Sequence, residues 1–238
     1  MGRVTATTPD LWHAYGRSRV GTDREVPASF CWIWGQDCGP GPEVLGPLSG
    51  SYVADLGAGA ARHAAHLAVR RPVARVDASP AQTAMAADLF GLVPRLRIVG
   101  ADVVAHLQAA RGSYDVLYSV FGAVDFTDPR QLLPAAWGAL SPGGRLVFST
   151  LAHFLSGDVA EADVVSRQIA AKTQDREGAW MPRWVLQAQV WVKPLDEAGF
   201  ADIGVEEWPA GEEPRAAASS CSCRPGAEEA RTAIASST

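Results

Sequence analysis

A short apolar run that ends in an acid and two glycines constrains this chain more than any other feature. It lies between Tyr52 and Ala65 and reads Y-V-A-D-L-G-A-G-A-A-R-H-A-A. The apolar residues predict a buried strand, and the alanine-rich residues behind the glycines predict a helix. Gly57 and Gly59 allow a tight turn at which a ligand can approach bare backbone. The stretch therefore predicts a strand, a turn and a helix with a ligand site between them.

Two classes of ligand use such a turn, and the charges around it separate them. A dinucleotide places its pyrophosphate at the helix N-terminus, where a third glycine lets the helix pack on the strand. Arg62 stands at the position of that third glycine, and Asp55, just before the turn, would repel phosphates. A carboxylate is favoured beside positive charge, such as an ammonium and a sulfonium. The sequence therefore favours S-adenosylmethionine as the ligand.

The segment V-A-D-L-G-A-G-A-A resembles the first motif of class I S-adenosylmethionine-dependent methyltransferases, and later segments resemble further motifs in the family's order. V-A-R-V-D, I-V-G-A-D-V and Y-D-V-L-Y-S-V-F-G-A-V-D resemble the second, third and fourth strands. L-S-P-G-G-R-L-V-F-S-T resembles the turn into the fifth, and P-L-D-E-A-G-F-A-D-I-G-V resembles the last helix and an antiparallel strand. The resemblance covers roughly Tyr52 to Trp208. It implies an α/β, Rossmann-like fold with a mainly parallel central sheet of six or seven strands flanked by helices.

The resemblance assigns the cofactor contacts to the glycine turn and to the ends of the following strands. Asp77 ends the second strand, where the family places an acid on the ribose hydroxyls. Asp102 follows the third strand, where an acid accepts a hydrogen bond from the adenine amino group. Taken singly, each acid could instead cap a helix or shape a turn. The expected cofactor contacts are Asp55, Gly57, Ala58, Gly59, Asp77, Ala78, Gln82, Asp102, Val103, Ser119, Val120 and Tyr15.

The helix after the second strand has a clear predicted start. Ser79 has the residue type of an N-cap, and Pro80 has that of the first helical position. In the family this helix begins beside the adenosine. Gln82 stands where a side chain commonly reaches the ribose or the adenine, or else it is a solvated residue of the first turn.

The composition indicates one ordinary globular domain with a small-molecule substrate. Of the 238 residues, 47% are hydrophobic and 20% are charged, which suffices for a sizeable core. The formal net charge of -5 and the pI near 5.5 disfavour a nucleic-acid surface, which would need a stripe of Lys and Arg. We therefore expect a small molecule rather than tRNA, rRNA or DNA as the acceptor.

The sequence predicts no metal site and no membrane segment. The four cysteines show no metal-ligand spacing with histidine, and we expect reduced thiols. His63 and His66 are three residues apart but lack a third ligand. The N-terminus has no signal-peptide core, and no segment has the apolar length of a membrane span. We expect a cytoplasmic protein, and a homo-oligomer is left open.

The chain divides into three parts in this interpretation. Residues 1–50 form an N-terminal helical and aromatic cap segment, and residues 51–208 form the methyltransferase core. Within the core, residues 155–191 form an insertion that caps the substrate pocket, with a helical stretch followed by A-W-M-P-R-W-V-L-Q-A-Q-V-W. Residues 209–238 lack the alternation of a buried strand and are expected to be a disordered tail. This tail offers no evident partner for the strand D-I-G-V-E-E-W.

The cap segment carries two candidate site residues. Thr8 before Pro9 predicts a capped helix that reaches Tyr15. Related small-molecule methyltransferases close such a helix over the cofactor, so Tyr15 either contacts its methionine end or anchors the helix to the core. The stretch F-C-W-I-W ends at Trp34, which either belongs to the core or lines the mouth of the pocket.

The candidate substrate residues follow the fourth and fifth strands. Asp125 could face the substrate or only turn its loop, and no N-P-P-Y or D-P-P-Y motif follows the fourth strand. His153 ends the fifth strand and is the best candidate for a general base, with a backbone-bonded corner histidine as the alternative. Trp180 and Trp184 could present flat surfaces to an aromatic acceptor or pack in the core. The expected catalytic residues are His153 and Tyr15.

The resulting hypothesis is methyl transfer from S-adenosylmethionine to an oxygen, nitrogen or carbon atom of a small, natural-product-type molecule with an aromatic or heterocyclic ring. One alternative is a protein that binds the cofactor without transferring its methyl group, as a regulatory partner would. A second alternative is a nicotinamide enzyme, which Asp55 and the missing third glycine disfavour.

Overall fold

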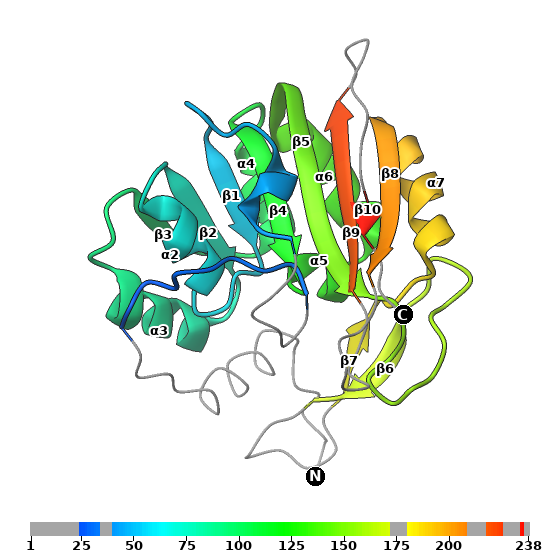
Figure 1. Ribbon diagram of the computed structural model, residues 1–238. Helices are drawn as coiled ribbons and strands as arrows, with labels where there is room; N and C mark the ends of the chain where they lie inside the picture. The colour runs from blue at the N-terminus through cyan, green and yellow to red at the C-terminus, as the bar shows by residue number, and fades with distance from the viewer. Residues whose placement is uncertain (1–23, 34–39, 172–179, 209–217, 226–233, 236–238) are drawn as a thin grey trace.

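We describe the architecture from a computed structural model, which describes residues 24–33, 40–171, 180–208, 218–225 and 234–235. Its centre is a sheet whose strand order is β10-β9-β5-β4-β1-β2-β3, with β8 paired to β9. Five of the described strands are parallel: β1 (Val53–Leu56), β2 (Val73–Asp77), β3 (Leu96–Gly100), β4 (Tyr114–Val120) and β5 (Leu140–Leu151). This arrangement confirms the predicted α/β, Rossmann-like fold (Figure 1).

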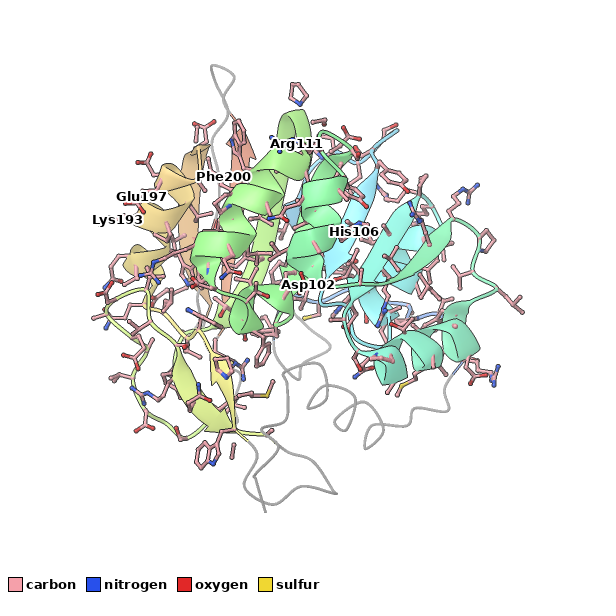
Figure 2. The ribbon with its side chains drawn as sticks, turned by 180° about the vertical axis from the view of Figure 1, so that it is seen from behind. Asp102, His106, Arg111, Lys193, Glu197 and Phe200 are labelled. Carbon is pink, nitrogen blue, oxygen red and sulfur yellow. The ribbon has the colours of Figure 1, made fainter. Side chains whose placement is uncertain are left out.

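Helices cover both faces of the parallel strands. The α-helices with described residues are α2 (Arg62–Ala68), α3 (Pro80–Phe90), α4 (Val103–Ala109), α5 (Ala123–Phe126), α6 (Pro129–Ala139) and α7 (Val192–Glu197). The 3-10 helices are η1 (Pro42–Leu45) and η2 (Ala188–Trp191). Figure 2 shows α4 and α6 in front of the sheet, with His106 on α4.

The alternation of side chains along the strands divides the interior into two main layers. Ala54 and Leu56 of β1 join a cluster that includes Leu107 of α4 and Leu132 of α6. Val53 joins the opposite cluster, which contains residues of α2 and α3. All four residues of β1 are buried. The carboxyl end of β1 lies at the edge of the sheet where parallel α/β proteins bind ligands.

The C-terminal region differs from the sequence prediction. Three antiparallel strands, β8 (Phe200–Trp208), β9 (Ala218–Pro225) and β10 (Ile234–Ala235), extend the described sheet to eight strands. The described sheet therefore has five parallel and three antiparallel strands where six or seven in all were expected, and β9 lies within the expected tail. The backbone of β9 pairs with both β5 and β8 (Figure 1). Ladder hydrogen bonds on both sides hold a strand whose sequence lacks hydrophobic alternation.

The insertion at residues 155–191 also differs from its prediction. Its described part contains no helix before η2; instead β6 (Arg167–Ala170) and β7 (Trp180–Arg183) form an antiparallel two-stranded sheet. Bridge contacts tie the segment before β6 to neighbouring backbone, as at Glu161 and Leu186. The small sheet lies beyond the carboxyl ends of the parallel strands (Figure 1). Tertiary pairing therefore overrides the local helical pattern, and a role as a substrate cap stays a prediction.

Candidate active site

The glycine turn follows β1 and needs glycine for steric reasons. Gly57 and Gly59 have φ values of 73° and 52°, in the left-handed region. A Cβ atom on Gly57 would lie 2.2 Å from the backbone nitrogen of Ala123, in the loop after β4. Ala61 also has a positive φ of 69°, just before α2. A non-glycine residue in this conformation indicates that the surrounding structure holds the turn firmly.

Asp77 closes this turn onto the end of β2. Its Oδ2 accepts a hydrogen bond from the backbone nitrogen of Gly59 at 2.8 Å, and its Oδ1 accepts one from the nitrogen of Ser79 at 2.8 Å. Ser79 in turn accepts from the nitrogen of Gln82 at 3.2 Å, so the predicted N-cap of α3 is confirmed. Asp77 thus connects the glycine turn with the start of α3, and a contact with ribose hydroxyls stays a prediction.

A buried arginine on β2 donates hydrogen bonds to the glycine turn, and the sequence interpretation did not predict it. Arg75 is fully buried on β2, where its Nε donates to the carbonyl of Gly59 at 2.9 Å and its Nη1 donates to Thr83 Oγ1 at 2.8 Å. Its Nη2 lies 3.7 Å from Asp77 Oδ2. The sequence did contain an indication of this role, because Arg75 is the one charged residue in the apolar segment V-A-R-V of a central strand. A buried charge needs hydrogen-bond or ionic partners.

Asp55 is buried at the end of β1, with an exposed fraction of 2%. It is in register with Tyr118 of β4, whose hydroxyl donates to Asp55 Oδ2 at 2.9 Å. Burial raises the pKa of Asp55 from 3.8 to about 7, while the hydrogen bond from Tyr118 and the charge of Arg75 lower it. The sequence interpretation predicted the acid at this position but not its tyrosine partner.

The two remaining polar cofactor candidates differ in their surroundings. Gln82 is buried, and its Oε1 lacks a hydrogen-bond partner within the described residues. This oxygen would lie 3.8 Å from a Cβ atom on Gly59, so it borders the turn. Asp102 is exposed and caps α4, with Oδ1 accepting from the nitrogen of Ala105 at 2.9 Å (Figure 2). Its capping alternative is therefore observed, while contact with adenine stays a prediction, as it does for Ala58, Ala78 and Val103.

The loop after β4 packs directly on the glycine turn. The hydroxyl of buried Ser119 donates to the carbonyl of Leu56 at 2.9 Å. A Cβ atom on Gly122 would lie 2.6 Å from that same carbonyl oxygen. Phe121, which follows Val120, has a positive φ of 48°, an uncommon conformation for a bulky residue. The backbone at the ends of β1 and β4 is therefore held in one arrangement, beside the expected path of the cofactor.

Asp125, for which a substrate contact or a turn role was expected, is buried and paired with an arginine. It is fully buried on α5, and its Oδ2 accepts from Nε of Arg183 at 3.1 Å and from Nη2 of the same residue. Its carbonyl also accepts from the nitrogen of Trp184 at 2.8 Å. Burial raises the pKa of Asp125, and the charge of Arg183 lowers it. The ion pair therefore joins β7 to α5, in the loop after β4.

The other substrate candidates lie in three different environments: the hydrophobic core, the surface and the end of a strand. Trp184 is buried in the main hydrophobic core, which is the alternative that the sequence left open for it. Trp180 is 59% exposed at the start of β7. His153 is half-buried after β5, with Nδ1 2.9 Å from the carbonyl oxygen of Phe154. Tyr15 and Trp34 lie outside the described residues.

His63 and His66 fasten the segment before η1 to α2. Burial lowers the pKa of His63 to about 4, and its ring lies 4.8 Å from that of Phe30. Nδ1 of His66 lies 2.7 Å from the carbonyl oxygen of Pro27. Across the described residues, no group of three or more His, Cys, Asp or Glu side chains is arranged to hold a metal ion. No described helix has the length and hydrophobicity of a membrane span.

Comparisons with known proteins agree with this geometry. A family model described as a methyltransferase domain matches residues 54–148. Trans-aconitate 2-methyltransferase of Paracidovorax citrulli is 34% identical over 110 residues, which cover 45% of this chain and 42% of that protein. The chain therefore matches less than half of this curated relative's length.

Two solved structures have the same fold. One is the 1,6-didemethyltoxoflavin-N1-methyltransferase of Burkholderia thailandensis with bound 1,6-didemethyltoxoflavin and S-adenosylhomocysteine. Its TM-score is 0.53 at 20% identity, over 74% of this chain and 72% of that one. The other is a glycopeptide N-methyltransferase complexed with S-adenosylhomocysteine. Its TM-score is 0.57 at 18% identity, over 81% of this chain and 94% of that one.

The sheet order and the glycine turn define a Rossmann-like domain, with Asp55 and Asp77 near the carboxyl ends of its first two parallel strands. These features agree with the match of residues 54–148 to a methyltransferase domain, and the fold is that of S-adenosylmethionine-dependent methyltransferases of known structure.

Proposed function

We propose that the protein transfers a methyl group from S-adenosylmethionine to an oxygen, nitrogen or carbon atom of a small molecule. The observation that carries this proposal is the glycine turn at the end of β1, with the carboxylates of Asp55 and Asp77 beside it. Such a turn accepts a ligand against bare backbone, and two carboxylates favour a cationic ligand over one with phosphates. The match of residues 54–148 to a methyltransferase domain and the cofactor product bound in two structural neighbours support the same ligand.

The side chains present suit this cofactor. Gln82 Oε1 is a buried acceptor without a protein partner in the described region, and a hydroxyl or amino group of an adenosine could satisfy it. Asp77 accepts hydrogen bonds from the backbone nitrogens of Gly59 and Ser79, and this fixed orientation beside the turn supports its proposed contact with the ribose. Asp55 supplies a buried carboxylate for a ligand ammonium group.

The cofactor supplies a methyl group on a sulfonium, which is its own leaving group. The protein's task is to hold the acceptor in line with that methyl group and to exclude water, which can lower the barrier by about 7 kcal/mol or more. The firmly packed loop after β4 and the anchored insertion are suited to this task. If the acceptor loses a proton, we propose His153 as the base, since Nδ1 donating to Phe154 leaves Nε2 as the acceptor.

The capping insertion favours a small acceptor with an aromatic or heterocyclic ring, of the natural-product type. Trp180 presents an exposed ring on β7, and the ion pair between Asp125 and Arg183 holds β7 against the core. A rigid aromatic side chain offers a large contact area to a flat molecule at little entropic cost. We place Trp180 at the rim of the acceptor site.

Calorimetric titration with S-adenosylhomocysteine tests the cofactor assignment. Replacing Asp77 by Ala is expected to weaken binding at least about tenfold, because the turn and the ribose lose a shared acceptor. Asp88→Ala is the matched control, because it removes an acid on α3 that forms an exposed ion pair with Arg24. Equal affinities of the wild type and the Asp77 variant would contradict the assignment.

A second experiment separates catalysis from mere binding. The protein is incubated with S-adenosylmethionine labelled in its methyl group and with a small-molecule extract, and methylated products are sought. Cofactor binding without any labelled product would favour the alternative of a non-catalytic partner protein. Stabilisation against thermal unfolding by NAD, and not by S-adenosylhomocysteine, would instead favour a nicotinamide enzyme.

A further inference from the structure

Tyr118 connects the aromatic segment before η1 with the acid at the glycine turn. Its ring is fully buried, with ring centroids 5.7 Å from Phe30 and 6.2 Å from Trp32, both edge-on. These contacts fix the ring on one face of β4, because aromatic side chains buried on several sides have little rotational freedom. The hydroxyl at the end of this fixed ring donates to Asp55 Oδ2 at 2.9 Å.

The pairing of the two residues is built into the sheet. Asp55 and Tyr118 are register partners on the adjacent parallel strands β1 and β4, so their side chains emerge on the same face. Burial raises the pKa of the Tyr118 hydroxyl well above its usual value, so it remains a proton donor throughout the neutral range. Asp55 therefore has a constant neutral partner, and its carboxylate is held in one orientation.

We propose that Tyr118 is a positioning residue, whose hydroxyl orients Asp55 to accept the ammonium group of the cofactor's amino-acid end. This inference rests on the proposed function and adds a specific determinant of cofactor recognition to it. A hydrogen bond to a charged carboxylate is stronger than a neutral one and stabilises the ionised form. Loss of the hydroxyl should therefore affect the ammonium contact more than the contacts of the adenosine.

Several groups act on Asp55, and each bears on its pH dependence. Arg75 and Asp77 of β2 lower and raise its pKa, respectively, while the Ala64 backbone hydrogen bond and Tyr118 lower it. His63 of α2, with its pKa near 4, is uncharged around neutrality. Because Asp55 in the free protein has a pKa of about 7, a ligand with an ammonium group should bind more tightly as the pH rises through that value.

The test compares two ligands and two tyrosine variants between pH 5.5 and 7.5. S-adenosylhomocysteine carries the ammonium group, whereas 5'-methylthioadenosine has the same adenosine without the amino acid. Tyr118→Phe keeps the ring and removes only the hydroxyl. Tyr114→Phe is the matched control on the same strand, because Tyr114 is buried and its hydroxyl lies 2.7 Å from His106 Nε2.

We expect the affinity of wild-type protein for S-adenosylhomocysteine to rise with pH, and that for 5'-methylthioadenosine to stay flat. Tyr118→Phe should move the midpoint of the rise upward by about one pH unit and weaken binding about tenfold near pH 6.5. Tyr114→Phe should leave both ligands unaffected. A folded Tyr118 variant that loses affinity for both ligands equally, with an unchanged midpoint, would overturn the inference.

The two proposals fail in different ways in this experiment. If wild-type protein binds neither adenosyl ligand at any pH, the proposed function fails and the inference fails with it. If wild-type protein binds both ligands with the same pH dependence, the cofactor assignment stands but Asp55 does not recognise the ammonium group, and the role of Tyr118 is refuted.

Discussion

Two buried carboxylates stand in the loops and strand ends that form the candidate site, and they have different partners. Asp55, 2% exposed, accepts a hydrogen bond from the neutral hydroxyl of Tyr118. Asp125, 0% exposed, accepts from the guanidinium of Arg183, which lies on β7. Burial raises the pKa of both acids. The charge of Asp125 is compensated by a cation in direct contact, whereas Asp55 can gain such a contact from a ligand.

This difference separates the two regions by function. The region around Asp125 uses its charge inside the protein, to hold β7 against α5. The region around Asp55 keeps a carboxylate with a raised pKa next to a glycine turn, at some cost in stability, as functional sites often do. Buried acids at neighbouring strand ends therefore need not share a role, and the nature of the partner decides between them.

The largest expected effect on stability comes from breaking the buried ion pair between Asp125 and Arg183. Replacing Arg183 by Met leaves Asp125 buried without its cation and is expected to destabilise the fold by about 3 to 5 kcal/mol in urea denaturation. Arg167→Met is the control on β6, since Arg167 pairs with Glu161 in a partly exposed bridge whose loss should cost about 1 kcal/mol or less. Equal losses in the two variants would show that the buried pair is not an anchor.

In the glycine turn, an added side chain is expected to destabilise the fold by steric conflict. Gly57→Ala should cost about 3 kcal/mol in the same assay, because its Cβ would meet the backbone of Ala123 at a positive φ. Gly50→Ala is the control, because Gly50 has a φ of 70° and no atom within 4 Å of the added Cβ. A Gly57 variant as stable as the Gly50 variant would mean that the turn yields easily.

The charge of Asp55 gives a smaller, pH-dependent effect. Its folded pKa of about 7 exceeds the value of 3.8 in the unfolded chain, so ionisation destabilises the fold increasingly as the pH rises from about 4 to 7. Asp55→Asn removes this effect, and its stability relative to wild type should improve by about 2 kcal/mol between pH 5 and pH 8. Thermal unfolding without ligand measures the difference, and a pH-independent difference would contradict the raised pKa.

The smallest expected effect is a gain at Ala61. Ala61→Gly should relieve the left-handed conformation before α2 and stabilise the protein by about 0.5 kcal/mol, since the added chain entropy of glycine offsets part of the relief. Urea denaturation measures this gain in the free energy of unfolding. A pH at which Asp55 is neutral keeps the pH-dependent effect of that acid out of the comparison. A loss of stability would mean that the Ala61 methyl group contributes more through packing than its backbone strain costs.

Local features of the molecule could be predicted from the chain itself. The glycines of the turn and the N-cap at Ser79 follow from patterns that span a few residues, and the resemblance placed the parallel strands along the chain. The acids Asp55 and Asp77 could be located from the sequence, because Asp55 lies next to the last residue of β1 and Asp77 ends β2. For Asp102 the two alternatives were named correctly, and its observed role is the capping one.

Partners that are distant in the sequence were decided only by the tertiary structure. Tyr118 meets Asp55 across 63 residues, and Arg183 meets Asp125 across 58. The strand β9 likewise depends on ladders with β5 and β8 rather than on its own composition. Short-range periodicity reports which face of an element is apolar, whereas the pairing of buried polar groups depends on which strands become neighbours. The sequence therefore determined the fold class and the position of the cofactor turn, and the tertiary structure decided which acid is paired within the protein.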